Sequence, residues 1–173
     1  MIDKLGKAIL TMFGIGYFRY APGTAASFVT CVIYYLLAVS SFDFVKNKIY
    51  IVCILLIILV YSIIIIDKLS YLFKKKDPKE IVIDEFIGQS IPLTFYFFQG
   101  FISIKELTFF KGYSFVGWII ISFILFRFFD IIKPFPINIV DKKMKNGLGV
   151  MLDDIIAGIY STITIYIIWA LWF

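Results

Sequence analysis

The sequence contains no histidine among its 173 residues. This absence excludes any mechanism that uses a histidine nucleophile or a histidine base, and it removes the commonest ligand of zinc sites. Cysteine is nearly absent too, and its two copies, Cys31 and Cys53, lie in different apolar segments without a CxxC motif. We interpret both cysteines as packing residues, because the sequence offers neither of them a disulfide or metal-binding motif.

Charged residues are nearly absent from five long stretches of the chain, where Arg127 is the one exception. Hydrophobic residues make up 61% of the sequence, whereas an ordinary soluble domain is about 45–50% apolar. Several stretches approach the roughly 20 residues that a helix needs to cross a bilayer, and none shows the alternation of a transmembrane β-strand. We therefore predict an all-α fold, a polytopic membrane helical bundle with about five transmembrane helices. The stretches cover residues 25–40, 49–66, 86–98, 115–129 and 155–173.

Lysine and arginine alternate in number between these stretches. Basic residues concentrate in the cytoplasmic loops of membrane proteins, so the alternation predicts a cytoplasmic N-terminus and an outer C-terminus. In chain order the segments carry three (Lys4, Lys7, Arg19), two (Lys46, Lys48), five (Lys68, Lys74, Lys75, Lys76, Lys79), two (Lys105, Lys111), five (Arg127, Lys133, Lys142, Lys143, Lys145) and none.

The first residues predict a short amphipathic helix that lies in the membrane interface. Leu5, Ile9 and Met12 fall on one helical face, with lysines beside them. A signal peptide is the alternative, but no small-residue cleavage pattern ends the first apolar run. The predicted single domain, residues 1–173, then consists of an interfacial helix (1–20) and a helical bundle (21–173).

Pro22 and Gly23 interrupt the chain just before the first apolar stretch. Thr24 is then placed to cap the first membrane helix, with Ser27 in its first turn. This is the pattern of an ordinary helix start. Free amides, the helix dipole and two hydroxyls also suit a phosphate group. We assign Thr24 and Ser27 to substrate binding.

Carboxylates gather at the predicted inner ends of three helices. Asp84 and Glu85 begin the third, Asp130 ends the fourth, and Asp153 and Asp154 begin the last. Adjacent carboxylates at a helix start can simply be partners of the helix dipole. Five carboxylates in one small site, however, repel each other and attract a cation. Mg²⁺ prefers such oxygen ligands, so we predict that all five bind it.

Arg127, Asp130 and Lys133 follow one another at intervals of three and share one helical face. The simplest interpretation is an ion pair at the membrane interface. Beside a metal, Arg127 and Lys133 would instead bind the oxygens of a substrate phosphate. A metal, basic groups and a carboxylate that activates water are what phosphoryl transfer requires. The predicted catalytic residues are Asp84, Glu85, Asp130 and Asp154.

Signatures of other phosphatase mechanisms are absent from the sequence, which contains no Cys-x5-Arg and no Asp-x-Asp-x-(Thr/Val). The phosphatidyltransferase pattern Asp-Gly-x2-Ala-Arg is absent as well. Metal-assisted attack by water is the chemistry that remains. A membrane cation transporter is the alternative, since carboxylates also line ion paths, but the acidic residues here gather at one side. A scaffold protein, the third interpretation, leaves the order of the charged motifs unexplained.

The sequence resembles the bacterial phosphatidylglycerophosphatase A family in four ordered blocks. Asp141, which follows the third block, fits the family as well. The blocks are Pro22-Gly23-Thr24 with Ser27; Asp84-Glu85-Phe86-Ile87-Gly88; Phe126-Arg127 with Asp130 and Lys133-Pro134-Phe135-Pro136-Ile137; and Gly147-x-Gly149-x-Met151-x-Asp153-Asp154 with Ala157-Gly158.

The resemblance implies a multi-pass enzyme of the bacterial inner membrane that acts on the cytoplasmic side. It implies Mg²⁺-dependent hydrolysis of the terminal phosphomonoester of phosphatidylglycerophosphate, which yields phosphatidylglycerol. We expect this lipid and the bilayer as partners, and no nucleic acid.

Overall fold

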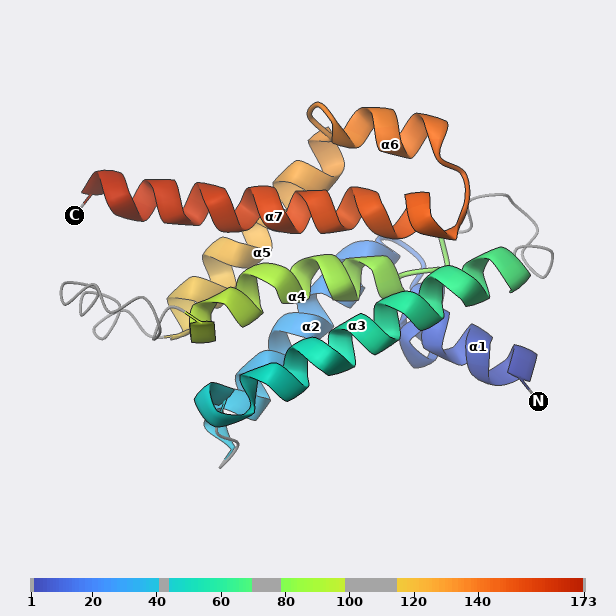
Figure 1. Cartoon of the computed structure of the whole chain (residues 1–173), viewed down its shortest axis with the longest axis horizontal. Coiled ribbons are helices and arrows are strands. Elements are labelled where there is room, and N and C mark those ends of the chain that lie inside the picture. The colour runs from blue at the N-terminus through green and yellow to red at the C-terminus, as the bar shows by residue number, and fades with distance from the viewer. Residues whose placement is uncertain (1, 41–43, 70–78, 99–114, 173) are drawn as a thin grey trace.

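In the computed structural model, which describes residues 2–40, 44–69, 79–98 and 115–172, every regular element is a helix. The predicted all-α fold is therefore confirmed. The elements, shown in Figure 1, are α1 (Ile2–Leu10), the 3₁₀ helix η1 (Met12–Tyr17), α2 (Pro22–Val39), α3 (Phe44–Leu69), α4 (Ile83–Phe98), α5 (Phe115–Ile132), α6 (Ile137–Lys143) and α7 (Gly147–Trp172).

Four described helices are long and apolar enough to cross a membrane. They correspond to four of the five predicted spans, and their apolar segments are Pro22–Val39, Ile49–Leu69, Phe115–Ile132 and Gly147–Ile168.

The remaining predicted span is α4, which has only 16 residues and contains Pro92. It packs against α2, α3, α5 and α7, so it lies at the centre of the bundle. The side chains of Gln89, Ser90 and Leu93 on α4 are completely buried. A short helix with an internal proline is tolerated where protein surrounds it.

Helices α4 and α7 cross at very close range through two glycines. A Cβ atom at Gly158 would overlap the carbonyl oxygen of Gly88, and a Cβ atom at Gly88 would lie 2.6 Å from the carbonyl oxygen of Asp154. Small residues allow helix backbones to approach closely in membranes, where packing is a main source of helix association. This crossing fixes the start of α4 beside the start of α7.

The N-terminal segment begins with a helix, as predicted, but this helix is shorter than residues 1–20. Helix α1 ends at Leu10, and the backbone turns through positive φ angles at Phe13 and Gly14 inside η1. Leu5, Ile9 and Met12 therefore do not form one continuous helical face. Leu10 is fully buried and Leu5 is 57% exposed, and α1 packs against α3.

The start of α2 also differs from the prediction that Thr24 caps it. The helix begins at Pro22, and Ala21 occupies the cap position without a side-chain hydrogen bond. Proline suits the first helical position because its missing N–H would have no partner there. Thr24 consequently lies inside the first turn.

The start of α7 is held by two side chains. The Asn146 side-chain oxygen accepts a hydrogen bond from the Gly149 amide at 3.0 Å, as expected of a capping residue. Asp67, at the end of α3, accepts a hydrogen bond from the Gly147 amide at 2.6 Å. The second contact ties α7 to α3.

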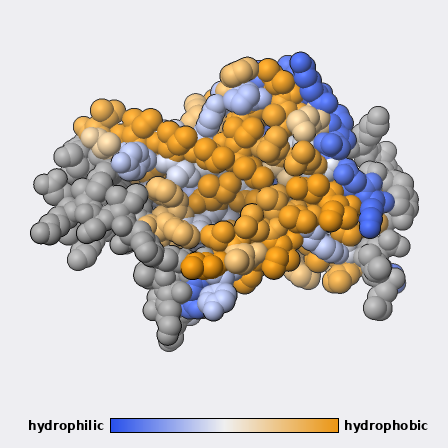
Figure 2. All heavy atoms as spheres, in the orientation of Figure 1, coloured by the Kyte–Doolittle hydropathy of each residue, from blue (hydrophilic) through white to orange (hydrophobic). Residues whose placement is uncertain are grey.

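Polar residues gather at one end of the bundle. The starts of α2, α4 and α7 lie there, together with the ends of α3 and α5 and the short helix α6 (Figure 1). Figure 2 shows hydrophilic residues at this end and a broad hydrophobic surface over the middle of the helices. Lys74, Lys75 and Lys76, counted above in the third basic segment, lie outside the described residues.

Substitution of Gly158 by alanine tests the α4–α7 crossing. The added methyl group must push the two backbones apart, so we expect Gly158→Ala to lower the free energy of unfolding by about 1–3 kcal/mol. Gly117→Ala on α5 is the matched control, because a Cβ atom there meets nothing within 4 Å. Thermal unfolding in detergent, followed by tryptophan fluorescence, gives both Tm values. Equal Tm values for the two variants would contradict the close crossing.

Candidate active site

A cavity of about 330 Å³ opens among the helix ends that carry the predicted site residues. Residues from the start of α2, the start of α4, the end of α5, α6 and the start of α7 line it. The charged residues of the lining are Lys79, Asp84, Glu85, Arg127, Asp130, Lys133, Asp141, Lys145, Asp153 and Asp154.

Three carboxylates in the cavity lie close enough to share one cation. One carboxylate oxygen from each of Asp84, Glu85 and Asp154 lies within 4.8 Å of the other two. Asp154 is only 4% exposed, and Glu85 Oε2 is buried with no hydrogen-bond partner. An unpartnered, buried carboxylate oxygen is costly unless a cation or another donor reaches it.

The backbone of α2 lies directly against this carboxylate group. A Cβ atom at Gly23 would overlap the carboxylate of Glu85. Any other residue at position 23 would therefore displace Glu85 or α2, which explains the glycine in the first turn of this helix. Thr24, the next residue, lines the cavity.

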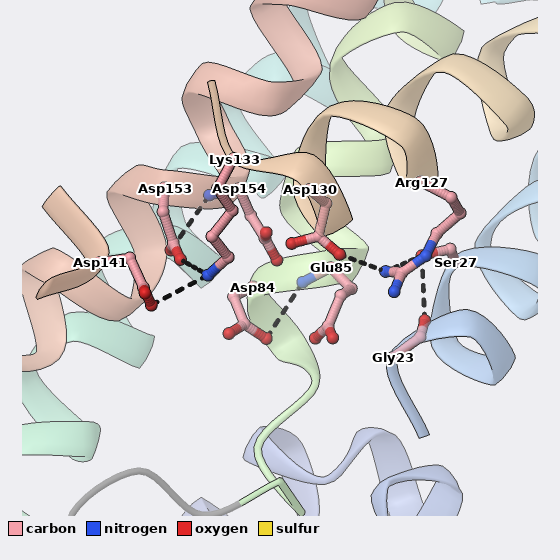
Figure 3. A network of polar contacts seen from close by, with 10 residues as sticks. All are labelled: Gly23, Ser27, Asp84, Glu85, Arg127, Asp130, Lys133, Asp141, Asp153 and Asp154. Carbon is pink, nitrogen blue, oxygen red and sulfur yellow. Dashed lines mark hydrogen bonds and ion pairs between the residues drawn. The ribbon is translucent and has the colours of Figure 1, made fainter. Parts of the chain in front are cut away.

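Asp130 forms an ion pair with Arg127, which offsets its repulsion from the other carboxylates. Arg127 Nη1 lies 2.8 Å from Asp130 Oδ2, one helical turn further along α5. The same nitrogen donates a hydrogen bond to Ser27 Oγ at 3.4 Å, and Ser27 in turn donates to the Gly23 carbonyl at 3.0 Å. Ser27 is fully buried behind Arg127. Its hydroxyl therefore positions the guanidinium group, as Figure 3 shows.

Lys133 bridges two further carboxylates on different helices. Its Nζ lies 2.7 Å from Asp153 Oδ2 and 2.9 Å from Asp141 Oδ1. Lys133 follows the end of α5 with a φ angle of 47°, a left-handed conformation that is uncommon for residues other than glycine. Burial lowers the pKa of Lys133, but the hydrogen bonds to Asp153 and Asp141 outweigh it and hold this pKa above its usual range. Lys133 therefore stays charged at neutral pH.

The structure thus brings all nine predicted site residues to one end of the bundle. Seven lie close together around the cavity in Figure 3: Asp84, Glu85, Arg127, Asp130, Lys133, Asp153 and Asp154. Thr24 lines the cavity, and Ser27 lies behind Arg127.

Sequence reasoning did not assign a role to three residues that shape the cavity. Asp141 lies on α6 among lysines, and its only signal was its fit to the family pattern. Lys79 and Lys145 line the side of the cavity near the starts of α4 and α7. Their place in predicted basic loops was the available signal.

Comparisons with known proteins find relatives along nearly the whole chain. The family model described as phosphatidylglycerophosphatase A matches residues 8–169. A Haemophilus influenzae protein named phosphatidylglycerophosphatase A is 35% identical over 90% of this chain and 83% of its own. An Escherichia coli protein of that name is 28% identical over 92% and 81%. A Bacteroides thetaiotaomicron protein, provisionally named a phosphatidylinositol-3-phosphatase, is 32% identical over 90% and 87%. No solved structure matches.

The ion pair between Lys133 and Asp141 predicts a pH-dependent contribution to stability. Burial raises the pKa of Asp141, but Lys133 outweighs it and holds this pKa below its usual range. A lowered folded-state pKa stabilises the protein above the unfolded-state value, about 3.9 for aspartate, and this stability is lost as the pH falls. We expect Asp141→Asn to cost up to about 1 kcal/mol at pH 7 and less below pH 4, measured as Tm.

The control is the same substitution in a Lys133→Met background. Without the Lys133 charge, the effect of Asp141→Asn on Tm should depend less on pH, because only Lys145 and Lys142 then lower the pKa of Asp141. A pH-independent effect of Asp141→Asn in the wild-type background would contradict the ion pair.

Proposed function

The chain belongs to the phosphatidylglycerophosphatase A family and is a lipid phosphatase, and we propose that it hydrolyses the terminal phosphomonoester of phosphatidylglycerophosphate with Mg²⁺ at the cytoplasmic face of a bacterial inner membrane. The products are phosphatidylglycerol and inorganic phosphate. The observation that carries this proposal is the meeting of Asp84, Glu85 and Asp154 beside Arg127 and Lys133 in one cavity.

The donor set of the cavity fits Mg²⁺. This ion prefers oxygen ligands and is usually held by one or two carboxylates together with water and substrate phosphate. Glu85 Oε2, which is buried without a hydrogen-bond partner, points to an additional positive group at this position. We propose that Asp84, Glu85 and Asp154 hold the ion. When bound, Mg²⁺ would neutralise charge on the phosphate and polarise its phosphorus–oxygen bonds.

Asp130 and Asp153 take a different part in this proposal from the metal ligation predicted for them. Each is already within 3 Å of a cation, Asp130 of Arg127 and Asp153 of Lys133. We propose that they hold these two cations toward the phosphate. Arginine presents a planar fork of donors to phosphate oxygens, and lysine acts as a point charge.

Hydrolysis then needs a water molecule and a group that accepts its proton. A carboxylate of the cluster takes the proton as the water oxygen attacks phosphorus. The bond between phosphorus and the glycerol oxygen breaks, and the glycerol oxygen leaves as a hydroxyl group with the proton that the carboxylate accepted from water and passes on. Arg127 and Lys133 stabilise the negative charge on the remaining phosphate oxygens while this happens.

The distribution of charge supports placing the site on the cytoplasmic side. Arg127, Lys133 and Lys145 all line the cavity, and Lys142 and Lys143 end the neighbouring helix α6. Basic residues of membrane proteins are enriched on the cytoplasmic side. The same charges also suit an anionic head group.

A phosphoinositide is the second candidate substrate. One relative, from Bacteroides thetaiotaomicron, is provisionally named a phosphatidylinositol-3-phosphatase. Phosphatidylinositol 3-phosphate and phosphatidylglycerophosphate share a lipid anchor and a terminal phosphomonoester, so the same groups could act on either. The alternative of a cation transporter is less favoured, because the carboxylates come from different helices but gather in one cavity (Figure 3).

An assay of phosphate release tests the proposed reaction and its metal. Purified protein in detergent should release phosphate from phosphatidylglycerophosphate in the presence of Mg²⁺, and faster than from phosphatidylinositol 3-phosphate. EDTA should abolish the release and excess Mg²⁺ should restore it, because the carboxylates would otherwise repel the anionic substrate. Full activity in EDTA would exclude the metal. Faster hydrolysis of the phosphoinositide would reassign the substrate.

Substitution of Asp154 tests the carboxylate group itself. We expect Asp154→Asn to lower kcat by on the order of 10²–10³-fold, as removal of a charge-stabilising group does in other enzymes, while Tm stays close to that of the wild type. Glu80→Gln is the control, because Glu80 precedes α4, the helix that carries Asp84 and Glu85, but does not line the cavity. Wild-type turnover in Asp154→Asn would refute the assignment.

A further inference from the structure

The polar cavity adjoins a second, apolar pocket. Ala21 and Thr24, at the start of α2, line both. The apolar pocket has a volume of about 710 Å³ and lies among η1, α2 and α5. Its apolar lining includes Ile15, Phe18, Ala25, Phe28, Val29 and Phe123.

The two pockets differ sharply in chemistry across these shared residues. On one side lie the carboxylates, Arg127 and Lys133 of the polar cavity. On the other side the rings of Phe28 and Phe123 meet edge to face, with centroids 6.4 Å apart, and join α2 to α5. Phe18 and Phe28 are 58% and 59% exposed, so the apolar pocket opens to the surroundings of the bundle.

A lipid phosphomonoester needs this combination of surfaces. Its phosphate requires cations and water. Its acyl chains, in contrast, are destabilised by about 0.8 kcal/mol for each methylene group that leaves an apolar environment for water. The chains must therefore leave the polar cavity by an apolar route. The other side of the cavity offers none, because Lys79, Asp141 and Lys145 line it.

We propose that the apolar pocket among η1, α2 and α5 receives the acyl-chain end of the lipid substrate, while its phosphate lies in the polar cavity. The lipid then crosses the start of α2 at Ala21 and Thr24. This inference rests on the proposed lipid phosphatase reaction. It assigns α2 a second role beside the contact of Gly23 with Glu85, since the helix also separates the head group from the chains.

A competing groove lies on another face of the bundle. It is lined by apolar residues of α3, α4 and α7, among them Leu56, Leu59 and Phe95. No residue lines both this groove and the polar cavity, and the close contact of Gly88 with Gly158 joins α4 to α7. The groove is therefore separate from the polar cavity, and it serves as the rival position for the acyl chains in the test below.

The test compares a bulky substitution in each apolar pocket. Ala25 lines the proposed pocket but not the polar cavity, and Leu56 lines the rival groove and is 53% exposed. The full chain in detergent micelles is assayed with dioleoyl and with dihexanoyl phosphatidylglycerophosphate. For Ala25→Trp we expect the ratio of kcat/KM for the long-chain over the short-chain lipid to fall about tenfold, a discrimination typical of a changed apolar pocket. Leu56→Trp should leave this ratio unchanged.

Photo-crosslinking of the wild-type protein gives a second measurement that does not depend on a variant. Phosphatidylglycerophosphate with a diazirine in one acyl chain should label residues of α2 and α5 near Phe28 and Phe123. An unchanged ratio in Ala25→Trp, a tenfold loss in Leu56→Trp, or labels confined to α3 and α4 would each overturn the inference. If the wild-type protein hydrolyses neither lipid, the proposed reaction itself has failed.

Discussion

Repulsion among buried carboxylates is the constraint on which the rest of this structure depends. Asp84, Glu85 and Asp154 each place an oxygen within 4.8 Å of the others, and like charges at such distances are tolerated only when a proton or a cation compensates them. Arg127 and Lys133 supply two positive charges, but each is bound closely by carboxylates outside this trio: Asp130 for Arg127, Asp141 and Asp153 for Lys133. The trio thus has no ion pair of its own among the described residues, which fits the Mg²⁺ that we propose it binds beside the substrate phosphate.

The bundle holds this unfavourable arrangement through backbone packing next to the charged side chains. The crossing of Gly88 and Gly158 fixes α4 against α7, and so sets Asp84 and Glu85 opposite Asp154. Asp67 ties the first amide of α7 to α3. In lipid, such packing and hydrogen bonds must supply much of the association between helices. The glycine contacts and the helix caps therefore offset the repulsion among the carboxylates, although we place none of them against the substrate.

The sequence predicted the helices and the site's location better than the contacts within the site. Stretches nearly free of charge, and the alternating numbers of lysine and arginine between them, depend on the solvent around each segment. They therefore indicate the spans and the common end of the site residues directly. The partners of Lys133 could not be derived, because Asp141 and Asp153 reach it only through the left-handed turn after α5 and the path of α6. Ser27 was predicted to bind phosphate, but it lies behind Arg127, a depth that helix periodicity alone does not reveal.

The most direct test of the account is to locate the metal. A crystal or cryo-EM structure of the protein with Mn²⁺ in place of Mg²⁺, with anomalous scattering in the crystal case, would show the ion without any assay of activity. The account predicts one ion bound by carboxylate oxygens of Asp84, Glu85 and Asp154, at about 2.1 Å, the distance typical of Mg²⁺ ligands. An ion bound elsewhere, or a fully loaded protein with these three carboxylates free of metal, would contradict it.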